Sequence, residues 1–212
     1  MDEAGIALGI CTNSMVLGDS RKKRTYVRSL QNREWVSGVE TISATGRSIR
    51  PIIIFKGKNL QTTWFQHDKV PDWIYTTSEN GWTSNRTALA WLTDVFLLET
   101  QPPGYETRLL LLDRHGNHIT VEFLWTCKQK NVYVIFLPPH STHILQPLGL
   151  FCFSLVKSRY RSQIAALASL DDAAPVKKHR FISYYHQARE EGLTPKTVKS
   201  GWRASGIYPW NP

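Results

Sequence analysis

The chain has few acidic residues, few cysteines and no long apolar run. Asp and Glu number 17 against 26 Lys and Arg, which gives a formal net charge of +9. Such an excess of positive charge attracts polyanions, and nucleic acid is the most common of these. The alternative is a basic protein without a polyanionic partner. Hydrophobic residues make up 42% of the chain, which is enough for a globular core and excludes a disordered polyelectrolyte.

Three cysteines, Cys11, Cys127 and Cys152, are widely separated and form no C-x-x-C pair. The sequence therefore carries no zinc-site signature and suits a reducing compartment. Cys152 lies in an apolar run, where we expect it to pack as a small hydrophobic residue. Because no apolar stretch is long enough to cross a bilayer and no secretory signal is present, we expect no membrane partner and a cytosolic or nuclear location.

Strand and helix patterns alternate along the chain. Residues 34–43 and 52–55 are rich in β-formers and flank an Ala44-Thr45-Gly46 turn, which predicts a hairpin. Later segments predict strands at 108–112 and 132–137 and helices at 83–100, 121–130, 151–170, 176–191 and 195–205. Strand, helix and strand between 108 and 137 imply a parallel pair with a right-handed crossover. The expected fold class is α/β: a ribonuclease H-like mixed sheet with helices on both faces, plus C-terminal helices.

Two aspartates occupy positions suited to metal-dependent phosphodiester chemistry. Asp2 precedes the apolar stretch 6–10, and Asp113 closes the buried strand 108–112. Carboxylates at the ends of neighbouring strands converge although they are far apart in sequence. Two metal ions about 3.5–4 Å apart can then clamp the attacking and leaving oxygens of a phosphodiester. Because like charges at this range repel, such a cluster is costly without metal.

Several strings resemble one known family, the catalytic domain of pogo/Tigger-type DDE transposases, which includes centromere protein B. They are Asp2-Glu3-Ala4-Gly5, residues 111–118 (LLDRHGNH), residues 137–149 (LPPHSTHILQPLG) and residues 200–212 (SGWRASGIYPWNP). The resemblance implies one DDE-type, ribonuclease H-like domain over 1–212, with 176–212 as its C-terminal helical extension. It implies an endonuclease or transposase that acts on DNA with Mg²⁺ or Mn²⁺ in the nucleus, and a homodimer as a candidate assembly.

The family pattern places three metal-binding aspartates at positions 2, 113 and 149, and the third is Gly149 in this chain. Asp2 and Asp113 are thus the expected catalytic and metal-binding residues of a degenerate site. The chain also begins inside the first motif, so we expect a domain truncated within its first strand. Three functions stay open: a degenerate nuclease domain that binds DNA, an active nuclease that uses Asp2 and Asp113 alone, and a domesticated chromatin-binding module without enzyme activity.

Candidate DNA contacts come from basic residues and from histidines near the aspartates. They are Arg21, Lys22, Lys23, Arg24, Lys56, Lys58, Arg114, His118 and His143. A run of adjacent cations raises local anion affinity, although a solvated loop or a nuclear localisation patch has the same composition. The histidines have a structural alternative, in which they shape loops through hydrogen bonds to the backbone.

The eight tryptophans are expected to lie mostly in the core or in helix packing. Trp64 and Trp73 fall in a polar insertion, where stacking on an extruded base is the alternative.

Overall fold

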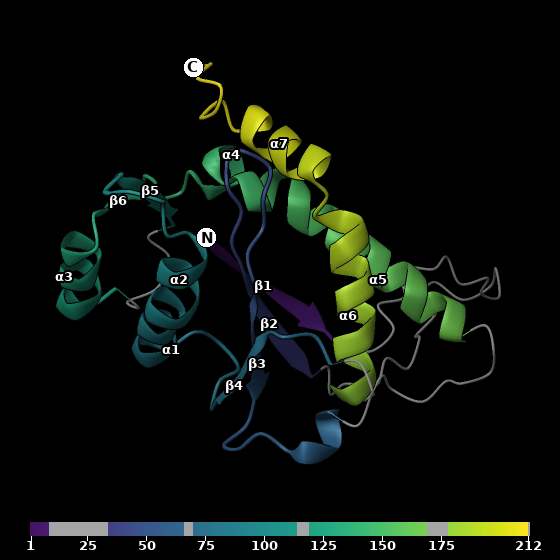
Figure 1. Cartoon of the computed structure of the whole chain (residues 1–212). Helices are drawn as coiled ribbons and strands as arrows, with labels where there is room; N and C mark the ends of the chain where they lie inside the picture. Colours follow the sequence, from purple (N-terminus) through teal and green to yellow (C-terminus); the bar gives the residue numbers. More distant parts are fainter. Residues whose placement is uncertain (9–33, 66–69, 114–118, 169–177, 212) are drawn as a thin grey trace.

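A hairpin of two strands, β2 (Trp35–Glu40) and β3 (Ile52–Lys56), lies at the centre of the molecule, where runs of β-branched and apolar residues flank a turn. The computed structural model describes residues 1–8, 34–65, 70–113, 119–168 and 178–211 (Figure 1). The strands are β1 (Asp2–Ala7), β2 (Trp35–Glu40), β3 (Ile52–Lys56), β4 (Ile74–Ser78), β5 (Arg108–Leu112) and β6 (Val132–Phe136). The α-helices are α1 (Asn85–Trp91), α2 (Leu97–Glu99), α3 (Val121–Gln129), α4 (Thr142–Leu145), α5 (Phe153–Ala168), α6 (Lys178–Gly192) and α7 (Pro195–Ala204). A 3-10 turn, η1 (Thr62–Phe65), and two π-helical segments, η2 (Leu92–Phe96) and η3 (Leu148–Cys152), complete the order.

Four strands form one mixed sheet in the order β1-β2-β3-β4. β2 is antiparallel to both β1 and β3, whereas β3 and β4 are parallel. β5 and β6 form a second, parallel pair connected through α3. The amino group of Met1 donates to the Leu111 carbonyl at 3.2 Å, so the start of β1 adjoins β5. The predicted hairpin, parallel unit and mixed α/β class are confirmed.

Helices cover both faces of the strands (Figure 1). The first four residues of β3 are all apolar and buried because alternate residues enter different cores. Ile53 and Phe55 belong to the core under α5, α6 and α7, whereas Ile52 and Ile54 belong to the core under α1, η2 and α3. Cys152 is fully buried in the first core, as expected for a small hydrophobic residue.

Some element bounds differ from the prediction. The sequence did not predict β4, whose five residues are all half-buried and therefore lack the alternation of a one-sided strand. The predicted strand 34–43 ends as β2 at Glu40, and the predicted helix 83–100 is divided into α1, η2 and α2. Ser84 does act as the predicted cap, because its side chain accepts from the Thr87 N–H.

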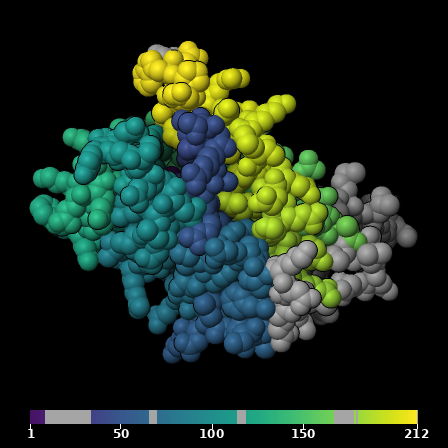
Figure 2. All heavy atoms as spheres, viewed as in Figure 1, coloured from purple at the N-terminus to yellow at the C-terminus, as the bar shows by residue number. Residues whose placement is uncertain are grey.

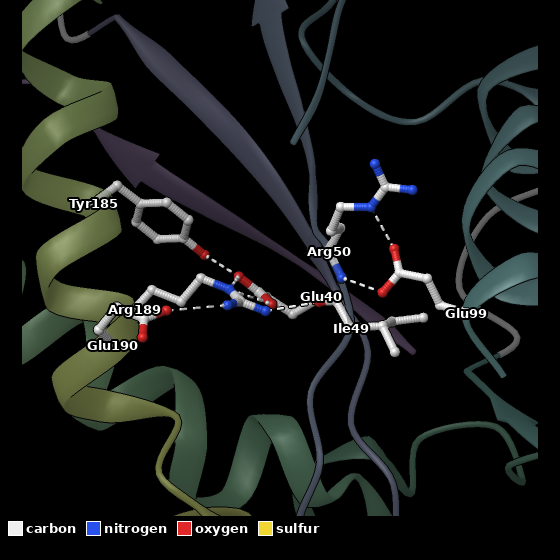
Figure 3. Close-up of polar contacts among 7 residues, drawn as sticks. All are labelled: Glu40, Ile49, Arg50, Glu99, Tyr185, Arg189 and Glu190. Atoms are coloured by element: carbon white, nitrogen blue, oxygen red, sulfur yellow. Dashed lines mark hydrogen bonds and ion pairs between the residues drawn. The ribbon is translucent and has the colours of Figure 1, made fainter. Parts of the chain in front are cut away.

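A buried ion pair fixes α6 to the hairpin (Figure 3). Glu40 is completely buried, and its carboxylate accepts from Arg189 Nε at 3.0 Å and from the Tyr185 hydroxyl at 2.8 Å. Arg50 donates to Glu99 of α2 on the other side. Removing one partner of a buried ion pair leaves the other charge buried and uncompensated, which is strongly destabilising. These contacts therefore fix how the two helical layers pack on the hairpin.

The expectation that most tryptophans are buried is wrong for half of them. Trp91 and Trp202 are buried, but four are exposed: Trp35, Trp82, Trp125 and Trp210. Trp64 and Trp73 pack inward rather than forming an open stacking platform. Their rings lie 4.8 Å from Phe55 and 5.8 Å from Tyr185, respectively.

Candidate active site

Three positions that are distant in sequence meet where β1 begins and β5 ends. Asp2 is the first residue of β1, Asp113 follows β5 directly, and Gly149 lies in η3. A Cβ atom built on Gly149 would lie 3.9 Å from Asp2 Oδ2. Asp113 raises the pKa of Asp2 through its charge, so the two carboxylates are within electrostatic reach of each other. The structure therefore brings the three positions together.

Strand alternation explains this convergence. Ala4 and Ile6 of β1 and Leu111 of β5 belong to the core side that contains η3 and α5. Side chains two residues apart on a strand share a face, so Asp2 and Asp113 face the same side as these apolar residues. Position 149 then enters the cluster from the helical layer.

Burial governs the titration of Asp2. It raises the pKa of this carboxyl from 3.8 to about 6. The ammonium group of Met1 and the Glu3 N–H, which donates to Asp2 Oδ1 at 2.8 Å, oppose the shift, whereas the charges of Asp113 and Glu3 add to it. Asp2 is therefore a carboxyl that gains and loses its proton close to neutral pH.

A cavity of about 420 Å³ opens beside the two aspartates. Glu3 lines this cavity, and its carboxylate accepts from the Thr83 N–H at 3.0 Å. The Glu3 carboxylate is therefore engaged by the backbone just before α1. The Thr142 hydroxyl donates to Asp113, and half-exposed Trp82 also lines the cavity. Sequence reasoning missed Glu3, Thr83 and Thr142. Glu3 and Thr142 had one signal, their adjacency to Asp2 and His143, and Thr83 lies near neither of these motifs.

A cation from α5 also acts on the cluster. Lys157 lies two helical turns beyond Gly149. Burial is the main cause that lowers its pKa and the charge of Arg161 adds to it, while the negative charge of Asp2 raises it. The lysine therefore lies within electrostatic range of Asp2 and partly offsets the negative charge there.

The predicted DNA contacts are divided by position. Lys56 and Lys58 are exposed at and just beyond the end of β3 and do not line the carboxylate cavity. Exposed His143 lies in α4 beside Thr142. Six candidates lie outside the described residues: Arg21, Lys22, Lys23, Arg24, Arg114 and His118. His140 has a backbone φ of 61°, which agrees with a turn-shaping position in the loop before α4.

The donor set suits one hard cation better than two. Within the described ranges, no group of three or more His, Cys, Asp or Glu side chains is placed to hold a metal. Magnesium is commonly bound through one or two carboxylates with several water ligands retained. Asp2 and Asp113 would serve as those ligands, and Gly149 has no side chain that could add a third oxygen donor.

Comparison with known proteins agrees with this arrangement. A family model described as DDE superfamily endonuclease matches residues 32–202, a range that includes Asp113 and Gly149 but not Asp2. A Cochliobolus lunatus protein named "MFS-type transporter clz9" is 34% identical over 213 residues. That match covers all of this chain but only 23% of the relative. No solved structure matches the chain. In the part of the chain that the structure describes, no helix combines the length and apolarity needed to cross a membrane.

Proposed function

Because this chain belongs to the DDE superfamily endonuclease family, we propose that it is a transposase-derived nuclease domain that binds DNA but no longer cuts it. The family acts on DNA and generally uses divalent metal ions. One observation carries the loss of cutting: position 149 faces Asp2 but has no side chain. The relative's name describes a transporter, but this chain spans only 23% of that protein.

The metal chemistry follows from the carboxylates that remain. When bound, magnesium would supply Lewis-acid stabilisation of a phosphodiester. Asp2 and Asp113 would hold a single ion, and the Thr142 hydroxyl, which donates to Asp113, would restrict the rotation of that carboxylate. With no donor at position 149, the chain lacks the ligand needed to hold a second ion beside the first.

A nicking assay on supercoiled DNA tests the loss of cutting. We expect no nicking by the natural chain with Mg²⁺ or Mn²⁺, and a gain of nicking in Gly149→Asp. Gly149→Ala is the matched control because it adds a Cβ without an oxygen. Adding Asp113→Asn to the Gly149→Asp variant should abolish the gain. Nicking by the natural chain that disappears in Asp113→Asn would instead favour an active nuclease with two carboxylates.

DNA binding has a second source of support, in the exposed face of α7. This face carries three cations: Lys196, Lys199 and Arg203. None of them has an ion-pair partner among the described residues, and residues 192–212 contain no Asp or Glu. Figure 2 shows the C-terminal segment (yellow) beside the hairpin tip (blue-violet), which adds exposed Arg47. Unpaired cations on one surface favour contact with a phosphate backbone.

The salt dependence of DNA binding tests this surface. Each phosphate contact contributes about 0.9 to the slope of log affinity against log salt, so Lys199→Gln/Arg203→Gln should reduce the slope by about 2. The control, Lys128→Gln/Lys130→Gln, removes the same charge from the C-terminal end of α3 and its cap. Equal losses in both variants would mean general attraction between charges, without a defined surface on α7.

Two further expectations belong to this proposal. A domain derived from a DNA transposase has its substrate on chromosomes, so we propose a nuclear location, which a tagged chain seen by microscopy would test. A homodimer is proposed from the family resemblance and is tested by the mass of the purified chain in solution.

A further inference from the structure

Two of the exposed tryptophans, Trp35 and Trp82, meet over Gly5 of β1. A Cβ atom built on Gly5 would lie 3.2 Å from Cη2 of Trp82 and 3.4 Å from Cε3 of Trp35. Trp82 and Trp35 are nevertheless 46% and 48% exposed. Glycine within a strand often marks a place where another group approaches closely, and here two indole rings do so. We call Gly5, Trp35 and Trp82 the aromatic shelf.

Hydrogen bonds hold the backbone of Trp82 in place just before α1. The Ser78 hydroxyl donates to the Trp82 carbonyl at 2.8 Å, and the Trp82 N–H donates to Asn80 Oδ1 at 2.9 Å. The next residue, Thr83, donates its N–H to the carboxylate of Glu3 in β1 at 3.0 Å. The backbone that carries the indole is therefore fixed although the indole itself is half-exposed. A binding group that is already oriented loses little conformational entropy when a ligand arrives.

One cation, Lys56, borders the aromatic shelf. The antiparallel register of β2 and β3, continued by one step, places Trp35 opposite Lys56. On the other side of β3, Lys56 pairs with Ser78, and a Cβ atom built on Gly81 would lie 3.2 Å from Cβ of Lys56. Lys56 is exposed and has no ion-pair partner within the described ranges. Its charge is therefore available to an anion beside the two indoles.

The aromatic shelf is continuous with the candidate active site. Trp82 also lines the cavity of about 420 Å³ beside Asp2 and Asp113. A ligand on the shelf would thus lie between the carboxylates and Lys56. A nucleotide matches this arrangement, because its base has a flat face for an indole and its phosphate has a charge for a lysine. The bases of a regular duplex have both faces covered by their neighbours, so only an unpaired base can offer a free face.

We propose that the aromatic shelf binds the base of an unpaired nucleotide in DNA, with Lys56 beside an adjacent phosphate. This inference rests on the proposed DNA binding and adds a preference for one form of DNA. The chain binds a duplex that contains an unpaired nucleotide more tightly than a fully paired duplex of the same length. Stacking of one base on an aromatic side chain corresponds to an affinity ratio of about 5 to 150.

Fluorescence anisotropy of an end-labelled duplex tests the preference. One duplex carries a single unpaired thymidine, and the other carries an abasic nucleotide at the same position. The abasic duplex keeps every phosphate and lacks only the base, so we expect it to bind at least about fivefold more weakly. Equal affinity for the two duplexes would overturn this inference and leave the proposed DNA binding intact. Failure to bind either duplex would overturn both.

Three tryptophan variants locate the effect. Trp82→Leu should remove the preference for the unpaired base, whereas Trp82→Phe should keep most of it because an aromatic ring remains. Trp125→Leu is the matched control, since Trp125 is 57% exposed on α3 and does not belong to the shelf. Loss of the preference in the control, or its survival in Trp82→Leu, would reject the shelf as the site. Equal weakening of both duplexes by Trp82→Leu would assign Trp82 to the sugar-phosphate backbone and reject a bound base.

Discussion

The consequence of glycine at position 149 can be measured without any assay of catalysis. Gly149 lies in the helical segment η3, its φ is not in the left-handed region, and a Cβ there would make only ordinary contacts at 3.7 Å or more. Replacing glycine by alanine within a helix contributes about 0.5–1 kcal/mol. Gly149→Ala should therefore raise the free energy of unfolding by that amount, and Tm by about 1–4 °C for a domain of this size.

The aspartate variant should behave in the opposite way. A carboxylate at position 149 would approach Asp2, and two charges about 5 Å apart repel by about 3 kcal/mol at an effective dielectric constant near 20. This exceeds the gain from replacing glycine, so Gly149→Asp should be less stable than Gly149→Ala at pH 8 in the presence of a chelator. Saturating Mg²⁺ should reverse the difference, because ligand binding stabilises only the folded state.

Urea denaturation with and without Mg²⁺ measures both effects. Gly149→Asn is the matched control, since it has the shape of aspartate without the charge. The reasoning would be refuted if Gly149→Asp and Gly149→Asn were equally stable with chelator and equally insensitive to Mg²⁺. Position 149 would then not face the carboxylate of Asp2.

Three other predictions follow from buried groups. Tyr185→Phe removes a hydrogen bond to the Glu40 carboxylate and should lower the free energy of unfolding by about 1.5–3 kcal/mol; an unchanged urea midpoint would contradict this role. Burial raises the pKa of Asp2 in the folded chain to about 6. Between pH 4 and 6, Asp2 therefore keeps its proton in the folded chain but has lost it in the unfolded chain. The contribution of Asp2 to stability thus falls as pH rises through this window, and Asp2→Asn should flatten the decline in a pH series of Tm; a slope identical to that of the natural chain would reject this. A Cβ at Gly201 would lie 2.6 Å from the Pro147 carbonyl, so Gly201→Ala should destabilise the chain by about 1–3 kcal/mol, and an unchanged Tm would show that α7 moves away at little cost.

The sequence predicted the elements that carry a strong period. Strand β3 and helix α3 were placed closely because continuous apolar runs and helical spacing are local signals. β4 was missed because its pairing with β3 is parallel and its residues are evenly half-buried. Neither property is visible in a window of five residues.

The candidate site shows the same division. Positions 2, 113 and 149 could be predicted because the motifs around them are long and ordered, and the structure places them together. The contacts of Glu3 with Thr83 and of Thr142 with Asp113 join segments 80 and 29 residues apart. Such contacts depend on how the layers pack, and no local pattern encodes them.

The same electrostatics explain why the fold tolerates Gly149. A carboxylate cluster destabilises a folded chain unless metal is bound. Burial is the main cause that raises the pKa of Asp2, and the charge of Asp113 adds to it. Removing the third carboxylate relieves repulsion at the cost of one helical glycine, which amounts to about 1 kcal/mol. Under the proposed function, glycine at position 149 is therefore close to neutral or favourable for folding. Selection for a stable DNA-binding domain alone would not restore an aspartate at this position, whereas selection for strand cleavage would.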